Sequence, residues 1–420
     1  MARAIRAVKA EIKRQCKADL SVAIVGGGIG GLALALALQL RGVRCRVFER
    51  DEHFHERRQG YGLTMQQGTS ALRSLGFDIG AGDNLGVHST RHLVLTSEGQ
   101  QVGEWGQRRW GQKCVKQKAG KNNFHIPRQL LRKLLLDALR PGTVAWGHRF
   151  VDYAKHEEEA PKPLAATLTP LHRFVEPSMS SETPFAIDSI VSPIISQNDF
   201  RAGFSDPPAF SLDPQSHWNS HGNELLSRRK TFCPKIHVEF LQRDGTNIEH
   251  AAHVLVGCDG INGTVRKRLV ADEACPLQYL GVLVVLGIVD NLSADTAGAD
   301  IADGKSAFQM SDGHVRLFGM PFDAKQTMWQ LSFPIPEELA KAISSQGSSA
   351  LKEEALRRCG EWSPPVPQLL HATGVDSLSG YPVYDRPLLT SACFQAGADA
   401  GVAVTLLGDA AHPMSPFKGQ

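Results

Sequence analysis

The chain has 420 residues, of which 42% are hydrophobic and 21% are charged, and its formal net charge is +3. These values are typical of a globular protein, so they exclude collagen-like and wholly disordered chains, and the length suggests two or three domains. The positive balance is too small to argue for a nucleic-acid partner. None of the eight cysteines belongs to a Cys-x-x-Cys pair, which speaks against a zinc site or a disulfide framework and fits reduced thiols.

The N-terminus combines a basic leader, residues 1–19, with an uncharged run, Leu20–Leu40. A basic flank before an apolar run is the pattern of a signal anchor or a membrane helix. Five glycines within residues 26–31 argue against a continuous helix, because each costs a helix interior about 0.5–1 kcal/mol relative to alanine. We therefore predict no transmembrane segment. Glu11 and Asp19 count against a mitochondrial presequence, and the leader also fits a solvated helix. We therefore expect a cytoplasmic protein, with a mitochondrion or another organelle as the alternative.

The uncharged run is better explained as a strand over residues 22–25, a glycine turn and a helix over residues 31–40. The strand is apolar at every position, as expected for a parallel strand buried on both faces. A second strand follows over residues 45–48. This order predicts the first βαβ unit of a doubly wound sheet.

The glycine turn contains Gly-x-Gly-x-x-Gly as Gly26, Gly28 and Gly31. The first glycine permits the sharp turn, the second lets the backbone approach a pyrophosphate, and the third lets the helix pack closely on the strand. Glu49 follows the second strand, where a carboxylate accepts hydrogen bonds from a ribose diol and repels a 2′-phosphate. The pattern predicts a dinucleotide site for FAD or NAD rather than NADP.

Two further apolar strands each end in a carboxylate beside a glycine, one at Asp259-Gly260 and the other at Gly408-Asp409. In an open α/β sheet, ligands lie at the carboxyl ends of the strands. Either pair alone also fits a strand that ends in a solvated turn. Together with the glycine turn, they point to one extended ligand.

These motifs resemble those of the class A, single-component FAD-dependent aromatic hydroxylases, the group of para-hydroxybenzoate hydroxylase, polyprenyl-methoxyphenol hydroxylase and tetracycline monooxygenase. The resemblance covers about residues 20–150 and 236–420. It implies an α/β fold, with a Rossmann-like FAD-binding domain on a parallel sheet and a smaller antiparallel β lid domain that binds substrate. The matching segments are the three glycines with Glu49-Arg50, Asp259-Gly260 with Val265-Arg266, and Gly408 to His412 with Pro416.

The resemblance also implies roles for single residues. Glu49 binds the adenosine ribose, Asp409 the flavin ribityl chain, and Asp259 the pyrophosphates of FAD and of the nicotinamide. Arg57 or Arg58 matches, by position, an arginine that helps to bind NAD(P)H, although both also fit a solvated loop. The implied cofactor-binding residues are Gly26, Gly28, Gly31, Glu49, Arg50, Arg128, Asp259, Gly260, Gly408, Asp409, Pro416 and Gly419.

The sequence departs from the family pattern at two places. Gly263 replaces the serine of the family's DGxxSxVR motif, which we expect to loosen the turn without removing a ligand. After Pro416 the chain ends at Gln420, where the family continues through a second glycine into a long helix. We therefore expect a C-terminally truncated chain.

We divide the chain into a leader, an FAD-binding domain in three parts, an insertion and a substrate domain. The insertion is rich in Ser, Pro, Asn and His without a steady period, so it fits a long loop or a mistranslated intron. His217 and His221 lie within it, but nothing around them indicates a helix, so we predict no metal site. The predicted bounds are 1–19 for the leader, 20–156, 235–275 and 380–420 for the FAD-binding domain, 157–234 for the insertion and 276–379 for the substrate domain.

The substrate domain contains strand-like runs over residues 281–289 and 315–334, which predict the antiparallel lid. Residues 339–358 predict a helix that is interrupted near residues 344–349. Met320, Phe322 and Trp329 lie on the predicted lid, and we favour core packing over substrate contact for all three.

By resemblance, NAD(P)H reduces the FAD, the reduced flavin adds dioxygen to form a C4a-hydroperoxide, and an aromatic or conjugated small molecule attacks the distal oxygen. No residue stands out as a catalytic acid or base, and His412 is better explained as ordering the turn. Two alternatives stay open, namely another flavin oxidoreductase such as an epoxidase or oxidase, and a non-catalytic truncated relative. The sequence contains no WxWxIP motif, which disfavours a halogenase.

Overall fold

The computed structural model describes residues 20–56, 60–77, 85–106, 123–155, 236–270, 274–390 and 402–414. The predicted leader and the predicted insertion, 157–234, lie outside these residues. So do Arg57, Arg58, Pro416 and Gly419, together with the last six residues of the chain.

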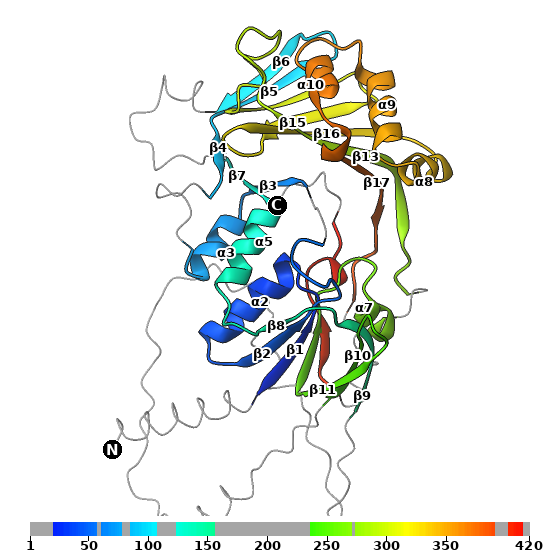
Figure 1. Ribbon diagram of the computed structural model, residues 1–420. Helices are drawn as coiled ribbons and strands as arrows, with labels where there is room; N and C mark the ends of the chain where they lie inside the picture. The colour runs from blue at the N-terminus through cyan, green and yellow to red at the C-terminus, as the bar shows by residue number, and fades with distance from the viewer. Residues whose placement is uncertain are drawn as a thin grey trace, which may run out of the picture. The chain divides into compact units, whose positions relative to one another are not determined.

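A five-stranded parallel sheet carries the glycine turn (Figure 1). Its strand β1 alternates between two hydrophobic cores, because Ala23 and Val25 face one core while Val22 and Ile24 face the other. The strand order brings the carboxyl ends of strands from distant parts of the chain to one edge. In sheet order the strands are β18 (Val404–Leu406), β12 (Val254–Gly257), β1 (Ser21–Val25), β2 (Arg44–Phe48) and β8 (Val144–Ala145).

Helices and two small sheets complete this part of the molecule. Helices α2 (Ile29–Leu40) and α5 (Arg128–Asp137) pack together over the parallel sheet, and α3 (Gly68–Ser74) and α7 (Thr264–Leu269) are shorter. One small sheet contains β3 (Gly62–Met65), β7 (Asn123–Pro127) and β4 (Val87–Ser89), and the other contains β11 (Asn247–Ala252), β10 (Ile236–Leu241) and β9 (Arg149–Lys155).

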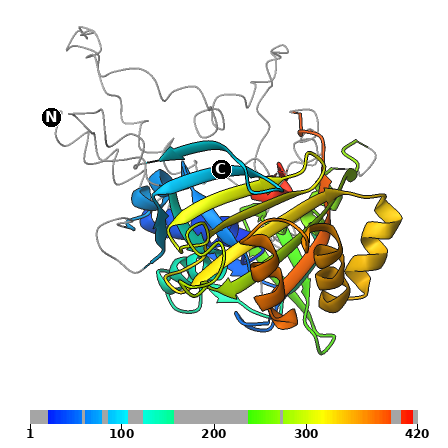
Figure 2. The same ribbon diagram turned by 90° about the horizontal axis from the view of Figure 1, so that it is seen from above.

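A seven-stranded sheet forms the predicted lid, and it is antiparallel except where β14 pairs with β5. Helices α8 (Glu337–Ser345), α9 (Ser348–Cys359) and α10 (Val366–Ala372) pack on one face (Figure 1). Figure 2 shows these helices at the β17 end, with β5 and β6 at the opposite edge. In sheet order the strands are β17 (Leu378–Asp385), β13 (Gln278–Asp290), β16 (Gln326–Pro334), β15 (Arg316–Pro321), β14 (Ser306–Ser311), β5 (Arg91–Thr96) and β6 (Gln101–Gly106).

The predicted α/β fold, with a parallel sheet and a separate antiparallel sheet, is confirmed. The lid sheet nevertheless takes β5 and β6 from residues 91–106, which the sequence placed with the FAD-binding domain, and β17 crosses the predicted boundary at residue 380. A strand's hydrophobic pattern shows which face is buried but not which sheet it joins. The domain division by residue number therefore stays a prediction.

The helix predicted over residues 339–358 is two helices, α8 and α9, that are separated at Gly347. Gly347 has a φ of 89°, a left-handed conformation that glycine adopts without steric cost. The predicted interruption near residues 344–349 is confirmed. None of the helices in the described ranges is both long and apolar enough to cross a membrane.

Candidate functional site

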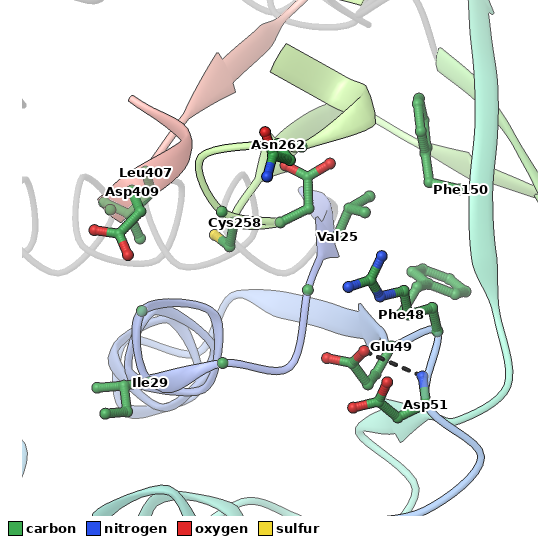
Figure 3. A pocket seen from close by; sticks show the side chains of 18 of the residues that line it. Val25, Ile29, Phe48, Glu49, Asp51, Phe150, Cys258, Asn262, Leu407 and Asp409 are labelled. Carbon is green, nitrogen blue, oxygen red and sulfur yellow. Dashed lines mark hydrogen bonds between the residues drawn. The ribbon is translucent and has the colours of Figure 1, made fainter. Parts of the chain in front are cut away.

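The carboxyl ends of β1, β2, β12 and β18 border a cavity of about 510 Å³. In Figure 3, Glu49 and Asp51 lie on one side of the turn between Val25 and Ile29, and Asp409 lies on the other side. The structure thus brings residues from three distant motifs to one cavity. The predicted site residues that line it are Gly26, Gly28, Glu49, Arg50, Arg128, Asp259, Gly260, Gly408 and Asp409.

The three glycines of the turn have different surroundings. Gly26 has a φ of 107°, and a Cβ there would overlap the backbone of Cys258. A Cβ on Gly31 would overlap the carbonyl oxygen of Gly26. A Cβ on Gly28 would meet no atom within 4 Å. The first and third glycines are therefore required by packing, whereas the second leaves its space to the cavity.

Helix α2 begins at the cavity without a side-chain cap. Its N-cap residue is Gly28, and no acidic side chain lies in the first turn. Ile29 and Gly30 of this turn line the cavity. Uncapped N–H groups and the positive end of the helix dipole attract an anion, so a pyrophosphate fits this position.

Glu49 is held in place by backbone amides and is 8% exposed. Its Oε2 accepts a hydrogen bond of 2.6 Å from the Gly27 amide. Its Oε1 accepts one of 3.2 Å from the Asp51 amide, which Figure 3 shows as a dashed line. Each carboxylate oxygen retains a lone pair for a further donor. The side chain is thus fixed as an acceptor at the cavity wall, as a ribose diol requires.

Arg132 also supports the glycine turn, although the sequence analysis did not single it out. It is 4% exposed, and its Nε donates a hydrogen bond of 2.8 Å to the Gly27 carbonyl. Its Nη2 lies 3.9 Å from Glu49 Oε2, and its guanidinium lies 5.0 Å from the centroid of the Phe54 ring. A sequence signal was available, because Arg132 follows Arg128 by four residues and so shares its side of α5.

Asp259 presents a buried carboxylate with one unused oxygen. Its Oδ2 accepts a hydrogen bond of 3.0 Å from the Val265 amide, while its buried Oδ1 has no partner within the part of the chain that the structure describes. Burial raises the pKa of this carboxyl above its ordinary value, although several backbone hydrogen bonds and the charge of Arg50 act to lower it. A buried acceptor without a donor is costly, so a ligand hydroxyl fits this position.

Gly263 has no side chain, and this leaves room for the Asp259 carboxylate. A Cβ on Gly263 would overlap the carboxylate of Asp259. The carboxylate therefore occupies the space that the family's serine would need. In this position Asp259 Oδ2 reaches the start of α7, where it accepts the hydrogen bond from the Val265 amide. The looser turn stays a prediction.

Arg128 and Asp409 lie at the far end of the cavity from Glu49. Burial raises the pKa of Asp409, and the charges of Arg128 and His412 oppose this shift. The Arg128 amide donates a hydrogen bond of 3.0 Å to the Tyr61 carbonyl, and the Arg128 guanidinium lies 5.2 Å from the centroid of the Tyr61 ring. A ligand that reaches both Glu49 and Asp409 must therefore be extended, which fits FAD.

The lid residues named from the sequence divide between the two faces of the large sheet. Trp329 is buried on the helix-covered face, where its Nε1 donates a hydrogen bond of 2.9 Å to Thr373. Met320 and Phe322 pack together on the other face, next to Tyr61. Among the described residues, no group of three or more His, Cys, Asp or Glu side chains is placed to hold a metal ion.

The buried His125, on β7, should make the folded chain less stable in acid. It is 1% exposed and hydrogen-bonds Thr64 and Ser89, and burial lowers its pKa to about 4. The unfolded chain binds a proton near pH 6.5 that the folded chain does not, so stability is highest above this pH and falls toward pH 4. We expect a loss of about 2 kcal/mol between pH 7 and pH 5 from this residue.

Urea unfolding at these two pH values measures this loss. His125→Gln should reduce the difference in unfolding free energy between pH 7 and pH 5. His314→Gln, at an exposed turn, serves as the control and should leave the difference unchanged. An equal pH dependence in all three proteins would refute the assignment.

Residues 19–165 match the family model described as an FAD binding domain. The aurachin C monooxygenase/isomerase of Stigmatella aurantiaca is 24% identical over 96% of this chain and 77% of its own length. The chloroplastic zeaxanthin epoxidase of Capsicum annuum is 31% identical over 41% of this chain and 23% of its own length.

The fold is similar to that of a solved structure, Klebsiella pneumoniae HpxO complexed with FAD and uric acid. The TM-score is 0.61 at 18% identity, with 96% of this chain and 76% of the other covered. The cavity agrees with these comparisons, because a pyrophosphate fits the start of α2 and hydroxyl groups fit Glu49 and Asp259. The chain therefore carries an FAD binding domain and is similar, over 96% of its length, to a monooxygenase.

Proposed function

We propose that this monooxygenase hydroxylates an aromatic or conjugated small molecule, with FAD as its cofactor and NAD(P)H as its reductant. The observation that carries the proposal is the single cavity that joins the glycine turn, Glu49, Asp259 and Asp409. Of the two relatives, one is named as a monooxygenase/isomerase that acts on aurachin C and the other as an epoxidase of zeaxanthin. Both names support a conjugated substrate.

Each part of the cavity is suited to one part of FAD. Glu49 accepts hydrogen bonds from the adenosine ribose, the first turn of α2 donates to the pyrophosphate, and Asp259 Oδ1 accepts from a hydroxyl. Asp409 accepts from the ribityl chain, and Arg128 places a positive charge beside it. The bound FAD supplies electron transfer from NAD(P)H and the activation of dioxygen.

Three further lining residues, which carry apolar surface, keep water away from the reaction. Tyr61, Leu63 and Leu407 line the cavity, where their apolar surface lowers the local dielectric constant. The charge of Arg128 then acts more strongly on negative charge that develops nearby. Arg57 and Arg58 remain our candidates for binding NAD(P)H, and Gly260 and Arg50 for the pyrophosphate region.

The test is the rate at which NAD(P)H bleaches the flavin of the FAD-loaded chain. We expect NADH or NADPH to reduce the flavin faster when a fitting aromatic or conjugated compound is present, and the product to contain one added oxygen atom. The flavin spectrum under anaerobic conditions gives the first measurement, and mass spectrometry after admission of air gives the second. A reduction rate that no such compound changes, together with no oxygenated product, would overturn the proposal.

Epoxidation is the second candidate, because the match to zeaxanthin epoxidase is 31% identical over 175 residues. Both reactions add one oxygen atom, so mass alone does not separate them. Mild acid opens an epoxide to a diol, with a further gain of one water, and leaves a phenol unchanged. The product after acid treatment therefore decides between hydroxylation and epoxidation.

A further inference from the structure

Helix α5 buries one charged residue on the face that packs over the parallel sheet. Its buried residues are Leu131, Arg132 and Leu135, and the two leucines belong to the core between the helix and the sheet. The next residue, Lys133, is exposed and pairs with Asp137. Burying a guanidinium beside leucines is costly unless its charge and its N–H groups find partners. The partners of Arg132 must therefore offset this cost.

Arg132 contacts three segments at once. Its Nε donates a hydrogen bond of 2.8 Å to the Gly27 carbonyl in the glycine turn, and its Nη1 donates one of 3.4 Å to the Phe54 carbonyl in the loop after β2. Its Nη2 lies 3.9 Å from Glu49 Oε2 at the end of β2. The ring centroids of Phe54 and Trp146 lie 5.0 Å and 5.7 Å from the guanidinium. One planar fork thus fixes the turn, the carboxylate and the loop relative to one another.

Arg132 also supplies the buried positive charge at the Glu49 end of the cavity. Glu49 and Asp51 are 8% and 4% exposed, so two carboxylates are buried within two residues of each other. Of the described residues that line the cavity, Arg132 is the only buried cation. Arg50 and Arg149 line it too, but both are exposed, and water screens their charges. A bound FAD adds the negative charge of its pyrophosphate, which increases the need for a buried cation.

The other titratable groups at the cavity do not replace this charge. His148 donates a hydrogen bond of 2.6 Å from Nδ1 to the Trp146 carbonyl, which satisfies that nitrogen. Asp259 is a further carboxylate, and burial raises its pKa. The charged and titratable groups that line the cavity around Glu49 are Arg50 and Asp51 after β2, Arg132 on α5, His148 and Arg149 at the start of β9, and Asp259 after β12.

We infer that Arg132 is a positioning residue for FAD that acts through Glu49: its charge keeps the carboxylate ionised, and its hydrogen bonds hold the glycine turn beside that carboxylate. The inference rests on the ribose role of Glu49 in the proposed function. An ionised carboxylate accepts both hydrogen bonds of a ribose diol, whereas a protonated one uses one oxygen as a donor.

The inference predicts how FAD affinity depends on pH. A buried carboxylate that has lost its cation takes up a proton at a higher pH than a paired one does. Below that pH it no longer accepts both ribose hydrogen bonds. Removing the charge of Arg132 should therefore make FAD binding weaken as the pH falls.

The experiment measures the Kd of FAD for the full apo chain at pH 6 and pH 8.5, by titration followed through flavin fluorescence. Arg132→Gln removes the charge and retains an N–H donor. We expect its Kd to exceed that of the unmodified chain about tenfold at pH 8.5 and about hundredfold at pH 6. Arg132→Lys keeps the charge but not the fork, so its Kd should be raised by one factor, about tenfold, at both pH values. Each ratio is taken at one pH, so the titration of FAD itself contributes equally to both chains.

A double variant tests whether the arginine acts through the carboxylate. Adding Arg132→Gln to Glu49→Gln should raise the Kd less than about tenfold, and equally at the two pH values, because no carboxylate remains to take up a proton. The apo double variant should also unfold at a higher temperature than apo Arg132→Gln, since it lacks the unpaired buried carboxylate. Lys133→Gln is the matched control on the same helix: Lys133 is exposed, and this variant should bind FAD as the unmodified chain does.

Three results would overturn the inference: Arg132→Gln binds FAD as tightly as the unmodified chain, its loss of affinity is equal at the two pH values, or its loss is equally large in the Glu49→Gln background. If apo Arg132→Gln does not fold, the double variant decides. A folded double variant supports the pairing of Arg132 with Glu49, and an unfolded one overturns it.

Glu49→Ala, measured alongside, separates this inference from the proposed function. If Glu49→Ala loses FAD affinity while Arg132→Gln gives one of the three contrary results, only the role of Arg132 is wrong. If Glu49→Ala retains full affinity, or if the unmodified chain binds no FAD, the proposed function fails together with the inference.

Discussion

Replacing Gly28 with valine should abolish FAD binding and leave the apo chain folded. Gly28 has φ −75° and ψ −177°, an extended conformation that any residue adopts. An added Cβ meets no atom within 4 Å, and the residue lines the cavity. The valine methyl groups would therefore fill the space through which a pyrophosphate approaches the backbone. We expect at least a hundredfold loss of affinity, about 3 kcal/mol.

Gly31→Ala serves as the matched variant. It should lower the stability of the apo chain and should not block FAD binding as Gly28→Val does. Its Cβ would overlap the Gly26 carbonyl oxygen, and a shift of Gly26 would strain the hydrogen bond of 2.8 Å that its amide donates to the Phe48 carbonyl. We expect a loss of stability of about 1–3 kcal/mol, as for other overpacked sites. Thermal unfolding of the apo chain and titration with FAD separate the two effects. If both variants lose only stability, the cavity is not the pyrophosphate site.

Glu49→Ala should weaken FAD binding by about a hundredfold or more. The carboxylate offers charge-assisted hydrogen bonds to the ribose, each of which contributes about 1.5–3 kcal/mol. It also fixes the Gly27 and Asp51 amides, so its removal loosens the turn that holds the pyrophosphate. Calorimetric titration of the apo chain with FAD measures the change.

Two variants control for this result. Glu249→Ala removes a carboxylate that is 69% exposed in its side chain and lies 3.7 Å from His237, and it should bind FAD normally. Glu49→Gln keeps the size of the side chain but loses the charge, so its affinity should lie between those of the unmodified chain and the alanine variant. Full affinity in Glu49→Ala would refute the ribose role.

The sequence predicted the glycine turn and the position of Glu49 because both depend on short segments. A strand, a turn and a helix follow one another within residues 21–40, and their spacing alone determines which glycine meets which backbone atom. The placement of Asp259 and Asp409 at the same cavity required one further step. Parallel strands end at one edge of a sheet, so carboxylates that follow such strands come together.

Other features depend on pairing between distant segments and could not be predicted. The joining of β5 to β14 connects residues more than 200 positions apart, and only this pairing brings β5 and β6 into the lid sheet. The contact between Asp259 and Gly263 depends on the side-chain conformation that the start of α7 selects through Val265. Neither the hydrophobic pattern nor the family motifs contain this information.

The strand order β18–β12–β1 has a consequence for how the protein is made on the ribosome. Strand β1 emerges more than 200 residues before its neighbour β12, and β18, which leads into Asp409, comes later still. Pairings between such distant segments form slowly, because a long loop must close before any contact stabilises it. The nascent chain therefore carries an incomplete parallel sheet while the residues between β2 and β18 are made. We expect chaperones to meet this intermediate, and FAD to bind only after synthesis has delivered β18.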